Sequence, residues 1–156
     1  AKLSGIVPPE EAFLAGIVHD VGKLMFFDLA AEAYHRAVKE ATPRDIVKVE
    51  NDLFGVNHQE LGLRCADEWG LPYEIAEVIG AHHSAFEDND NPELVNLVGV
   101  AESLTRMWGV GASKLSGEEL PELIASSPFP LDMELLNKLE SVVHDDFVAL
   151  RSAFIE

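Results

Sequence analysis

Apolar residues recur at spacings of three and four along almost the whole chain, and no stretch alternates polar and apolar residues long enough to indicate a strand. The first such segment opens at Pro8 and Pro9, which suit the first turn of a helix. We expect this helix to continue through His19 and Asp20 and to bury a stripe made of Phe13, Ile17, Val21 and Leu24. The pattern as a whole predicts an all-helical fold.

Capping signals divide the middle of the chain into further helices. Thr42 and Pro43 predict the start of a helix that ends at Gly55. Asn57 opens the next helix, with Glu60 placed to complete a capping box, so His58 should lie in a first helical turn. Gly70 ends this helix, and Leu71 and Pro72 begin the following one. That helix reaches the adjacent His82 and His83, and its expected core residues are Ile75, Val78 and Ile79.

The carboxyl-terminal third predicts three more helices after a polar loop over 87–92. One runs from Pro92 to Trp108, a shorter one is capped by Ser116 with Glu119 and ends near Ser126, and the last begins near Asp132. The last helix should bury one apolar stripe, formed by Leu135, Leu139, Val142, Val143, Phe147 and Leu150. No repeat or linker divides the chain, so we predict a single domain over residues 1–156, with the final helices at 116–156.

Charge and composition narrow the classes of function. The chain has 156 residues, 47% of them hydrophobic, and a formal net charge of −17. A chain this apolar is expected to fold, and its excess of carboxylates excludes binding of bare nucleic acid through a basic surface.

No membrane segment or secretory signal is recognisable. The longest uncharged run, Leu123 to Leu131, is shorter than a bilayer requires and contains prolines. The one cysteine, Cys65, cannot form an internal disulfide. These observations predict a cytoplasmic protein without a membrane partner.

Four of the six histidines occupy positions that suggest a site. They are His19, which is followed by Asp20, then His58, and the pair His82 and His83. Imidazole nitrogens with a carboxylate are typical ligands of iron, manganese or zinc. Their separation in sequence means that packing of several helices would have to bring them together, as in the metal sites of helix bundles.

Simpler interpretations remain open for each histidine. A histidine at a helix end often only caps the helix or interacts with its dipole, and His35 and His144 lack any such pattern and are expected on the surface. Lys23 follows Asp20 by three positions, so the two share one side of a helix. Lys23 could hold a phosphate there or simply pair with Asp20.

The segment Ala15-Gly16-Ile17-Val18-His19-Asp20-Val21-Gly22-Lys23-Leu24 resembles the His-Asp signature of the HD superfamily of metal-dependent phosphohydrolases. A second set of motifs is similar to the HDOD domain, and it consists of Glu50, the segment from Phe54 to Gly62, Trp69-Gly70-Leu71-Pro72, and Ile79 through His83. The motifs span residues 9–108. The resemblance implies an all-α bundle found in bacterial signalling proteins and often fused to sensory or output domains.

The resemblance also implies a ligand set. In catalytically competent HD relatives the ligands are an early His, the doublet, further histidines and a late Asp. Carried over, the metal ligands are His19, Asp20, His58, His82 and His83, Lys23 would contact phosphate, and Glu102 stands where the late Asp is expected.

Three departures bear on activity. Glu102 is one methylene longer than the expected Asp. No histidine precedes His19, so we expect the amino-terminal helices of the domain to be missing or their ligand to be lost. The Gly-Tyr-Pro segment that follows the His pair in the HD-GYP branch is replaced here by Ser84-Ala85-Phe86. This replacement argues against hydrolysis of cyclic di-GMP.

Three functions follow as hypotheses. The first is a regulatory HDOD domain, non-catalytic or with a degenerate metal site, which acts through other signalling proteins, fused domains or a small phosphate-containing ligand. The second is an active metal-dependent phosphohydrolase in which Asp20 and Lys23 would be catalytic. The third is a structural module, without metal, whose histidines only hold the helices together.

Overall fold

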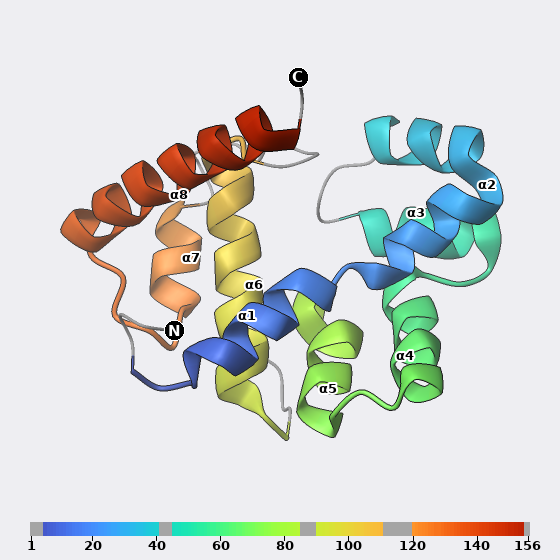
Figure 1. Cartoon of the computed structure of the whole chain (residues 1–156), viewed down its shortest axis with the longest axis horizontal. Coiled ribbons are helices and arrows are strands. Elements are labelled where there is room, and N and C mark those ends of the chain that lie inside the picture. Colours follow the sequence, from blue (N-terminus) through green and yellow to red (C-terminus); the bar gives the residue numbers. More distant parts are fainter. Residues whose placement is uncertain (1–4, 41–44, 85–89, 111–119, 155–156) are drawn as a thin grey trace. The chain divides into compact units, whose positions relative to one another are not determined.

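The computed structural model describes residues 5–40, 45–84, 90–110 and 120–154, and within these ranges the chain is helical without any strand. The predicted all-α fold is therefore confirmed. The helices are α1 (Pro9–Val18), α2 (Val21–Glu40), α3 (Ile46–Phe54), α4 (His58–Trp69), α5 (Tyr73–Ala81), the 3-10 turn η1 (His82–Ser84), α6 (Pro92–Met107), α7 (Leu120–Ser126) and α8 (Met133–Phe154) (Figure 1).

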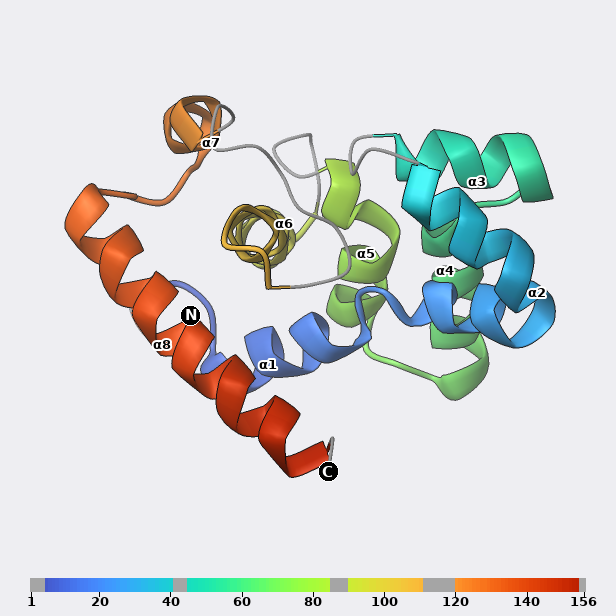
Figure 2. The same ribbon diagram turned by 90° about the horizontal axis from the view of Figure 1, so that it is seen from above.

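The chain forms two compact units, residues 1–100 and residues 101–156. In the first unit, α4 packs against both α2 and α5, while α1 packs against α5 and α3 against α2 (Figure 2). The core of this unit combines residues from several helices, among them Ala15, Val21, Ala66, Ile79 and Val95. Each of these side chains is less than one tenth exposed, which gives the unit a continuous apolar interior.

The predicted end of α3 and both predicted ends of α4 agree with the structure. Asn57 accepts a hydrogen bond from the backbone N–H of Glu60 at 3.0 Å, and its amide donates to the Glu60 carboxylate at 3.0 Å. Gly55 and Gly70 end α3 and α4 with φ of 72° and 63°, a conformation that glycine adopts without steric strain. These caps hold α4 in place, and α4 begins with His58.

The first predicted helix is wrong in two respects. It stops at Val18, and His19 and Asp20 form a turn before α2 begins at Val21. Of the expected buried stripe only Val21 is buried, whereas Phe13, Ile17 and Leu24 are 71%, 63% and 62% exposed. Because the helix is interrupted at the doublet, one continuous helical stripe does not describe this segment. Instead, Ala15 faces the core.

The second unit contains α7, α8 and the end of α6. Asp132 caps α8 as expected, because its carboxylate accepts the N–H of Leu135 at 2.7 Å. The predicted buried stripe of α8 is wrong: Val142, Phe147 and Leu150 are exposed, and Leu135, Leu139 and Val143 are half-buried. Leu136, which was not expected in the stripe, is 3% exposed. Amphipathic spacing therefore predicted the helix but not the face that packs.

Some predicted features lie outside the described residues. They are the cap at Thr42 and Pro43, residues 87–89 of the polar loop over 87–92, and the capping pair Ser116 and Glu119. The prediction of a single domain over the whole chain stays a prediction. No helix in the described ranges is long and apolar enough to cross a membrane.

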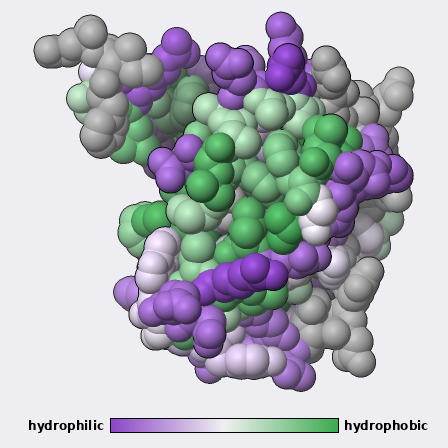
Figure 3. All heavy atoms as spheres, turned by 90° about the vertical axis from the view of Figure 1, so that its right-hand side faces the viewer, coloured by the Kyte–Doolittle hydropathy of each residue, from purple (hydrophilic) through white to green (hydrophobic). Residues whose placement is uncertain are grey.

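A groove of about 560 Å³ runs between α2 and α3. Most of the residues that line it are apolar, namely Ala33, Ala37, Val49, Leu53 and Phe54. The charged residues Arg36 and Asp52 complete the lining. Figure 3 shows this side of the molecule, where apolar side chains gather within a polar border.

Candidate metal centre

The His-Asp doublet lies in the turn between α1 and α2. The backbone N–H of His19 still bonds to the carbonyl of Ala15 at 2.9 Å, and the N–H of Lys23 bonds to the carbonyl of Asp20 at 2.9 Å. The doublet therefore belongs to the end of one helix and the start of the next. This turn directs both side chains toward the ends of other helices.

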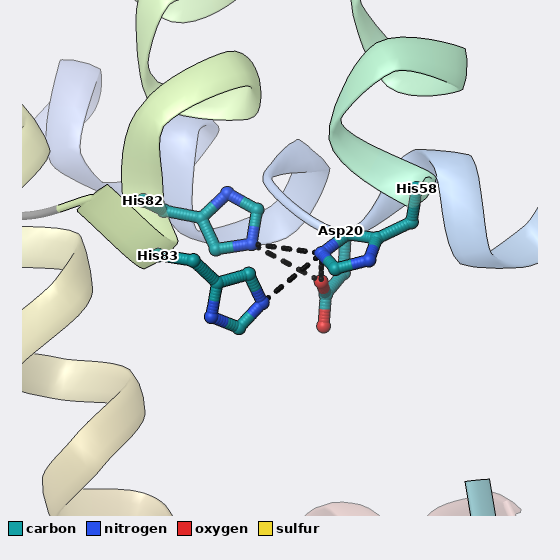
Figure 4. A group of neighbouring side chains, drawn as sticks. All are labelled: Asp20, His58, His82 and His83. Atoms are coloured by element: carbon teal, nitrogen blue, oxygen red, sulfur yellow. Dashed lines mark hydrogen bonds and ion pairs between the residues drawn. The ribbon is translucent and has the colours of Figure 1, made fainter. Parts of the chain in front are cut away.

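The remaining histidines come from two further helix ends. His58 is the first residue of α4, and His82 and His83 form the 3-10 turn that ends α5. Figure 4 shows the side chains of Asp20, His58, His82 and His83 pointing toward one another. One ligand atom from each of the four lies within 4.8 Å of every other, which is close enough for one metal ion to be shared.

Three imidazole Nε2 atoms and one carboxylate oxygen make up this group. His58 Nε2 lies 3.3 Å from His82 Nε2 and 3.1 Å from His83 Nε2. Asp20 Oδ1 lies 3.6 Å from His58 Nε2 and 3.5 Å from His82 Nε2. The rings of His58 and His82 are buried, whereas His83 is half-buried and gives the group a side toward solvent.

The hydrogen bonds of the other ring nitrogens define the tautomers. His58 Nδ1 lies 2.5 Å from the Glu50 carboxylate, and His82 Nδ1 lies 3.1 Å from the carbonyls of both Val78 and Ile79. Carboxylates and carbonyls only accept hydrogen bonds, so Nδ1 must carry the proton in both rings. When these rings are neutral, the Nε2 atoms of His58 and His82 therefore present lone pairs to each other and to Asp20.

The Nδ1 atom of His19 also carries the proton, because it faces a carbonyl oxygen. Its Nδ1 donates to the carbonyl of Gly16 at 2.8 Å, and its Nε2 lies 3.5 Å from Asp20 Oδ2. Its ring also packs edge-on against His82, with centroids 5.0 Å apart. A third imidazole thus directs its acceptor nitrogen toward Asp20.

Asp20 Oδ1 provides the test of whether a metal fits. This oxygen is buried and has no hydrogen-bond partner within the described part of the chain. A buried carboxylate oxygen that faces two imidazole lone pairs is electrostatically unfavourable, and a cation would satisfy all three atoms at once. The donor set of imidazoles and a carboxylate suits a divalent transition metal. The residues present therefore fit such an ion.

The pKa values of the group favour the same charge state. Burial alone would raise the pKa of Asp20, but the approach of His82 and the positive charge of Lys23 outweigh it and hold the pKa far below its usual range. Burial lowers the pKa of His58, although the Glu50 carboxylate opposes this effect. At neutral pH the group thus offers an ionised carboxylate and a neutral His58, which are the forms that bind metals.

Lys23 pairs with the outer oxygen of Asp20. Its Nζ donates to Oδ2 at 2.7 Å, and the side chain is 20% exposed. The simple ion pair that the sequence allowed is therefore present. The Lys23 side chain is thus partly accessible beside the group.

Two residues of the site had no predicted role. Glu50 is fully buried on α3 and accepts hydrogen bonds from His58 and from the Tyr34 hydroxyl. Burial alone would raise the pKa of the Glu50 carboxyl, but the hydrogen bonds from His58 lower this pKa below its usual value. Burial and the Glu50 carboxylate raise the pKa of the Tyr34 hydroxyl. The signal in the sequence was the place of Glu50 among the motifs similar to the HDOD domain, to which no role was attached, whereas Tyr34 had no such signal.

The other predicted residues are placed as follows. Glu102 lies on α6 in the second unit, where its carboxylate pairs with Arg106, and its role as a ligand stays a prediction. His35 and His144 are exposed, as expected.

Comparison with known families gives one match. Residues 1–85 match the HDOD domain, and this span contains the doublet, His58 and the pair His82 and His83. No curated protein and no solved structure matches the chain.

Proposed function

The chain belongs to the HDOD domain family, and from this premise we propose that it is a regulatory, signal-transducing domain. Its His-Asp centre binds one divalent transition metal and does not turn over a substrate. Signal transmission then depends on how the occupied centre positions the ends of α2, α4 and α5, from which its ligands come.

The observation that carries metal binding is the convergence of acceptor atoms on one point. Nδ1 of His58 and Nδ1 of His82 are both held as donors, so in the neutral rings both Nε2 lone pairs face the oxygen of Asp20 that has no hydrogen-bond partner among the described residues. A purely structural cluster would be expected to pair a donor with this oxygen as well, as His83 Nε2 at 3.1 Å can pair with His58 Nε2. A divalent cation supplies the missing positive charge and acts as a Lewis acid toward any ligand that reaches it.

The ligand types limit the metal. Imidazole with carboxylate suits iron, manganese or zinc, whereas magnesium and calcium prefer oxygen ligands. Asp20, His58, His82 and His83 are the proposed ligands of this ion. His19, whose Nε2 lies 3.5 Å from Asp20 Oδ2, is a further candidate.

The state of Asp20 favours binding over catalysis. A general base works best with a pKa near the working pH, and the pKa of Asp20 lies far below it because of His82 and Lys23. Its outer oxygen is already occupied by Lys23. Asp20 can thus hold a cation, but it is a poor proton acceptor.

The proposed partners are other signalling proteins, or sensory and output domains in the same polypeptide. Exposed apolar side chains such as Phe13 and Ile17 on α1 offer contact area for such a partner. A small phosphate-containing ligand is a further candidate, because Lys23 lies beside the metal centre and is partly accessible.

An active phosphohydrolase is the second candidate, and Lys23 is the observation in its favour. Its ammonium beside a metal centre could neutralise charge on phosphate oxygens. In that reading Asp20 and Lys23 would be catalytic, and Lys23 would have to leave Asp20 to reach the substrate.

One experiment separates the three functions. The chain is stripped with chelator, reloaded with Mn²⁺, Fe²⁺ or Zn²⁺, and assayed against phosphomonoesters, phosphodiesters and nucleotides beside Asp20→Asn. The regulatory proposal expects stoichiometric metal and no turnover above the variant. Metal-dependent turnover that Asp20→Asn abolishes would establish the phosphohydrolase instead, and absence of bound metal would leave the structural module.

A further inference from the structure

Two buried polar residues lie on the side of His58 that faces away from Asp20. Glu50 lies on α3 and Tyr34 on α2, and the side chains of both are fully buried. The Tyr34 hydroxyl donates to Glu50 Oε1 at 2.7 Å. The other carboxylate oxygen, Oε2, accepts the backbone N–H of His58 at 2.8 Å and lies 2.5 Å from His58 Nδ1.

From this geometry we infer that Glu50, held by Tyr34, is a positioning residue that fixes His58 in the tautomer whose Nε2 can bind metal. The inference rests on the proposed function, because a metal is the ligand that this tautomer serves. Neither residue contacts Asp20, and each acts only through His58.

The Glu50 carboxylate can position His58 because its Oε2 atom accepts two hydrogen bonds from that residue. The first N–H groups of a helix have no partner within it, and Oε2 satisfies the one that belongs to His58. Because the same oxygen also receives Nδ1–H, the backbone and the ring of His58 are both fixed by one atom. The Nε2 atom then points at Asp20 without freedom to rotate away.

Tyr34 in turn fixes the carboxylate. Its ring stacks on Phe26 with centroids 4.9 Å apart and lies 6.3 Å from the ring of Phe54. These contacts leave the hydroxyl one direction, toward Glu50 Oε1. Three helices are thus joined through one buried carboxylate, with α2 supplying Tyr34, α3 supplying Glu50 and α4 supplying His58.

Charge gives Glu50 a second effect on the site. A carboxylate hydrogen-bonded to the far nitrogen of an imidazole makes the near nitrogen more basic and a better ligand. Glu50 also adds a negative charge close to the site without occupying a coordination position. Its loss should therefore weaken metal binding even if the ring of His58 stays in place.

Glu50→Gln tests the inference, because glutamine keeps the shape of the side chain and an acceptor oxygen but loses the charge. The matched control is Glu60→Gln, which removes a carboxylate from the first turn of α4, the helix that His58 begins. The Glu60 carboxylate contacts Asn57 and not the ring of His58. Metal affinity is measured by competition with a chromophoric chelator for Zn²⁺. The ring nitrogens of His58 are followed in the metal-free chain by long-range ¹H–¹⁵N correlation spectra.

The expected result is that Glu50→Gln weakens the affinity for Zn²⁺ by about 10- to 100-fold, the range typical of such partners. Glu60→Gln should change it by less than about twofold. In the metal-free spectra, wild-type His58 should be protonated at Nδ1, and Glu50→Gln should shift protonation toward Nε2. A Glu50 that only supports the fold would lower the melting temperature and leave affinity and tautomer unchanged, and that result would overturn the inference.

If Glu50→Gln does not fold, Tyr34→Phe takes its place, since it removes one hydroxyl and keeps the ring. It should weaken Zn²⁺ binding in the same direction but less, and unchanged affinity in a folded Tyr34→Phe would overturn the inference. The proposed function fails separately, through absence of metal binding by the wild type. In that event the tautomer spectra of the wild type and the variants still decide whether Glu50 positions His58.

Discussion

The backbone carbonyl of His58 lies directly against the α-carbon of Gly22, so that a Cβ added to Gly22 would overlap this oxygen and come within 2.8 Å of the backbone N of Gly62. Gly22 follows the doublet by two positions and lies in the first turn of α2. Helices α2 and α4 therefore touch backbone to backbone beside the metal centre. The glycine in the His-Asp motif sets the distance between Asp20 and His58.

Gly22→Ala is expected to disrupt the first unit. Because the neighbouring atoms are backbone, they cannot move aside as a side chain could, and overpacking of this kind costs about 1–3 kcal/mol or more. The matched control is Gly16→Ala on α1, where an added Cβ meets nothing within 4 Å and alanine should be neutral or stabilise the helix by up to about 1 kcal/mol. Urea unfolding of both variants measures the difference. Equal stability of the two would contradict the close approach of α2 and α4.

Asp20→Asn should lower the affinity for metal by at least about tenfold, equivalent to about 1.4 kcal/mol. The reason is that Oδ1 is the anionic atom facing the imidazoles, and an amide oxygen lacks its charge. Asp28→Asn, at an exposed position on α2, serves as the control. Calorimetric titration with Mn²⁺ and Zn²⁺ makes the measurement. Asp20 would not be a ligand if both variants bound as tightly as the wild type.

The metal-free chain should lose stability as the pH falls from about 7.5 to 5.5. Burial lowers the pKa of His58 in the folded state, whereas in the unfolded chain it returns to about 6.5. The unfolded state then binds more protons, so the free energy of unfolding falls as the pH drops below about 6.5. Asp20 and Glu50 have lowered pKa values and stay ionised across this window, so they contribute no slope there.

Urea unfolding at several pH values in the presence of chelator tests this expectation. His58→Gln should flatten the dependence of stability on pH, and the exposed His35→Gln should leave it as in the wild type. A slope that persists unchanged in His58→Gln would mean that another group titrates in this range.

Metal should stabilise the chain by mass action. An ion that binds only the folded state adds about 2.7 kcal/mol to the free energy of unfolding at a free concentration one hundred times its dissociation constant. Thermal unfolding with and without excess Zn²⁺ measures this effect. The increase should be much smaller in His82→Gln, because the buried Nε2 of His82 belongs to the ligand group. An equal increase in both proteins would place the bound ion elsewhere.

Local chemistry made much of the fold predictable. Asn57 with Glu60, Gly55, Gly70 and Asp132 mark helix ends through hydrogen bonds and backbone angles that depend on a few neighbouring residues. The faces that pack were less predictable, because burial depends on which helices meet. Phe13 and Phe147 fit amphipathic patterns and are nevertheless exposed.

The candidate site divides in the same way. The ligand-type residues were recognisable because a His-Asp doublet and a His pair are unusual in sequence, and the structure brings Asp20, His58 and His82 together. Glu50 stood among the motifs similar to the HDOD domain, but its role was not predicted, since its contact with His58 depends on how α3 meets the start of α4. A residue that acts through a tertiary hydrogen bond leaves little trace in the spacing of the chain.

X-ray absorption at the metal edge of the Zn²⁺-loaded chain tests the central claim most directly, because it reports which atoms surround the ion. The account predicts one ion per chain with several imidazole nitrogens at about 2.0–2.1 Å and at least one oxygen. The imidazole signal should decrease in His58→Gln. An ion surrounded by oxygens alone, or no stoichiometric ion at all, would contradict the claim that the histidines and Asp20 form a metal centre.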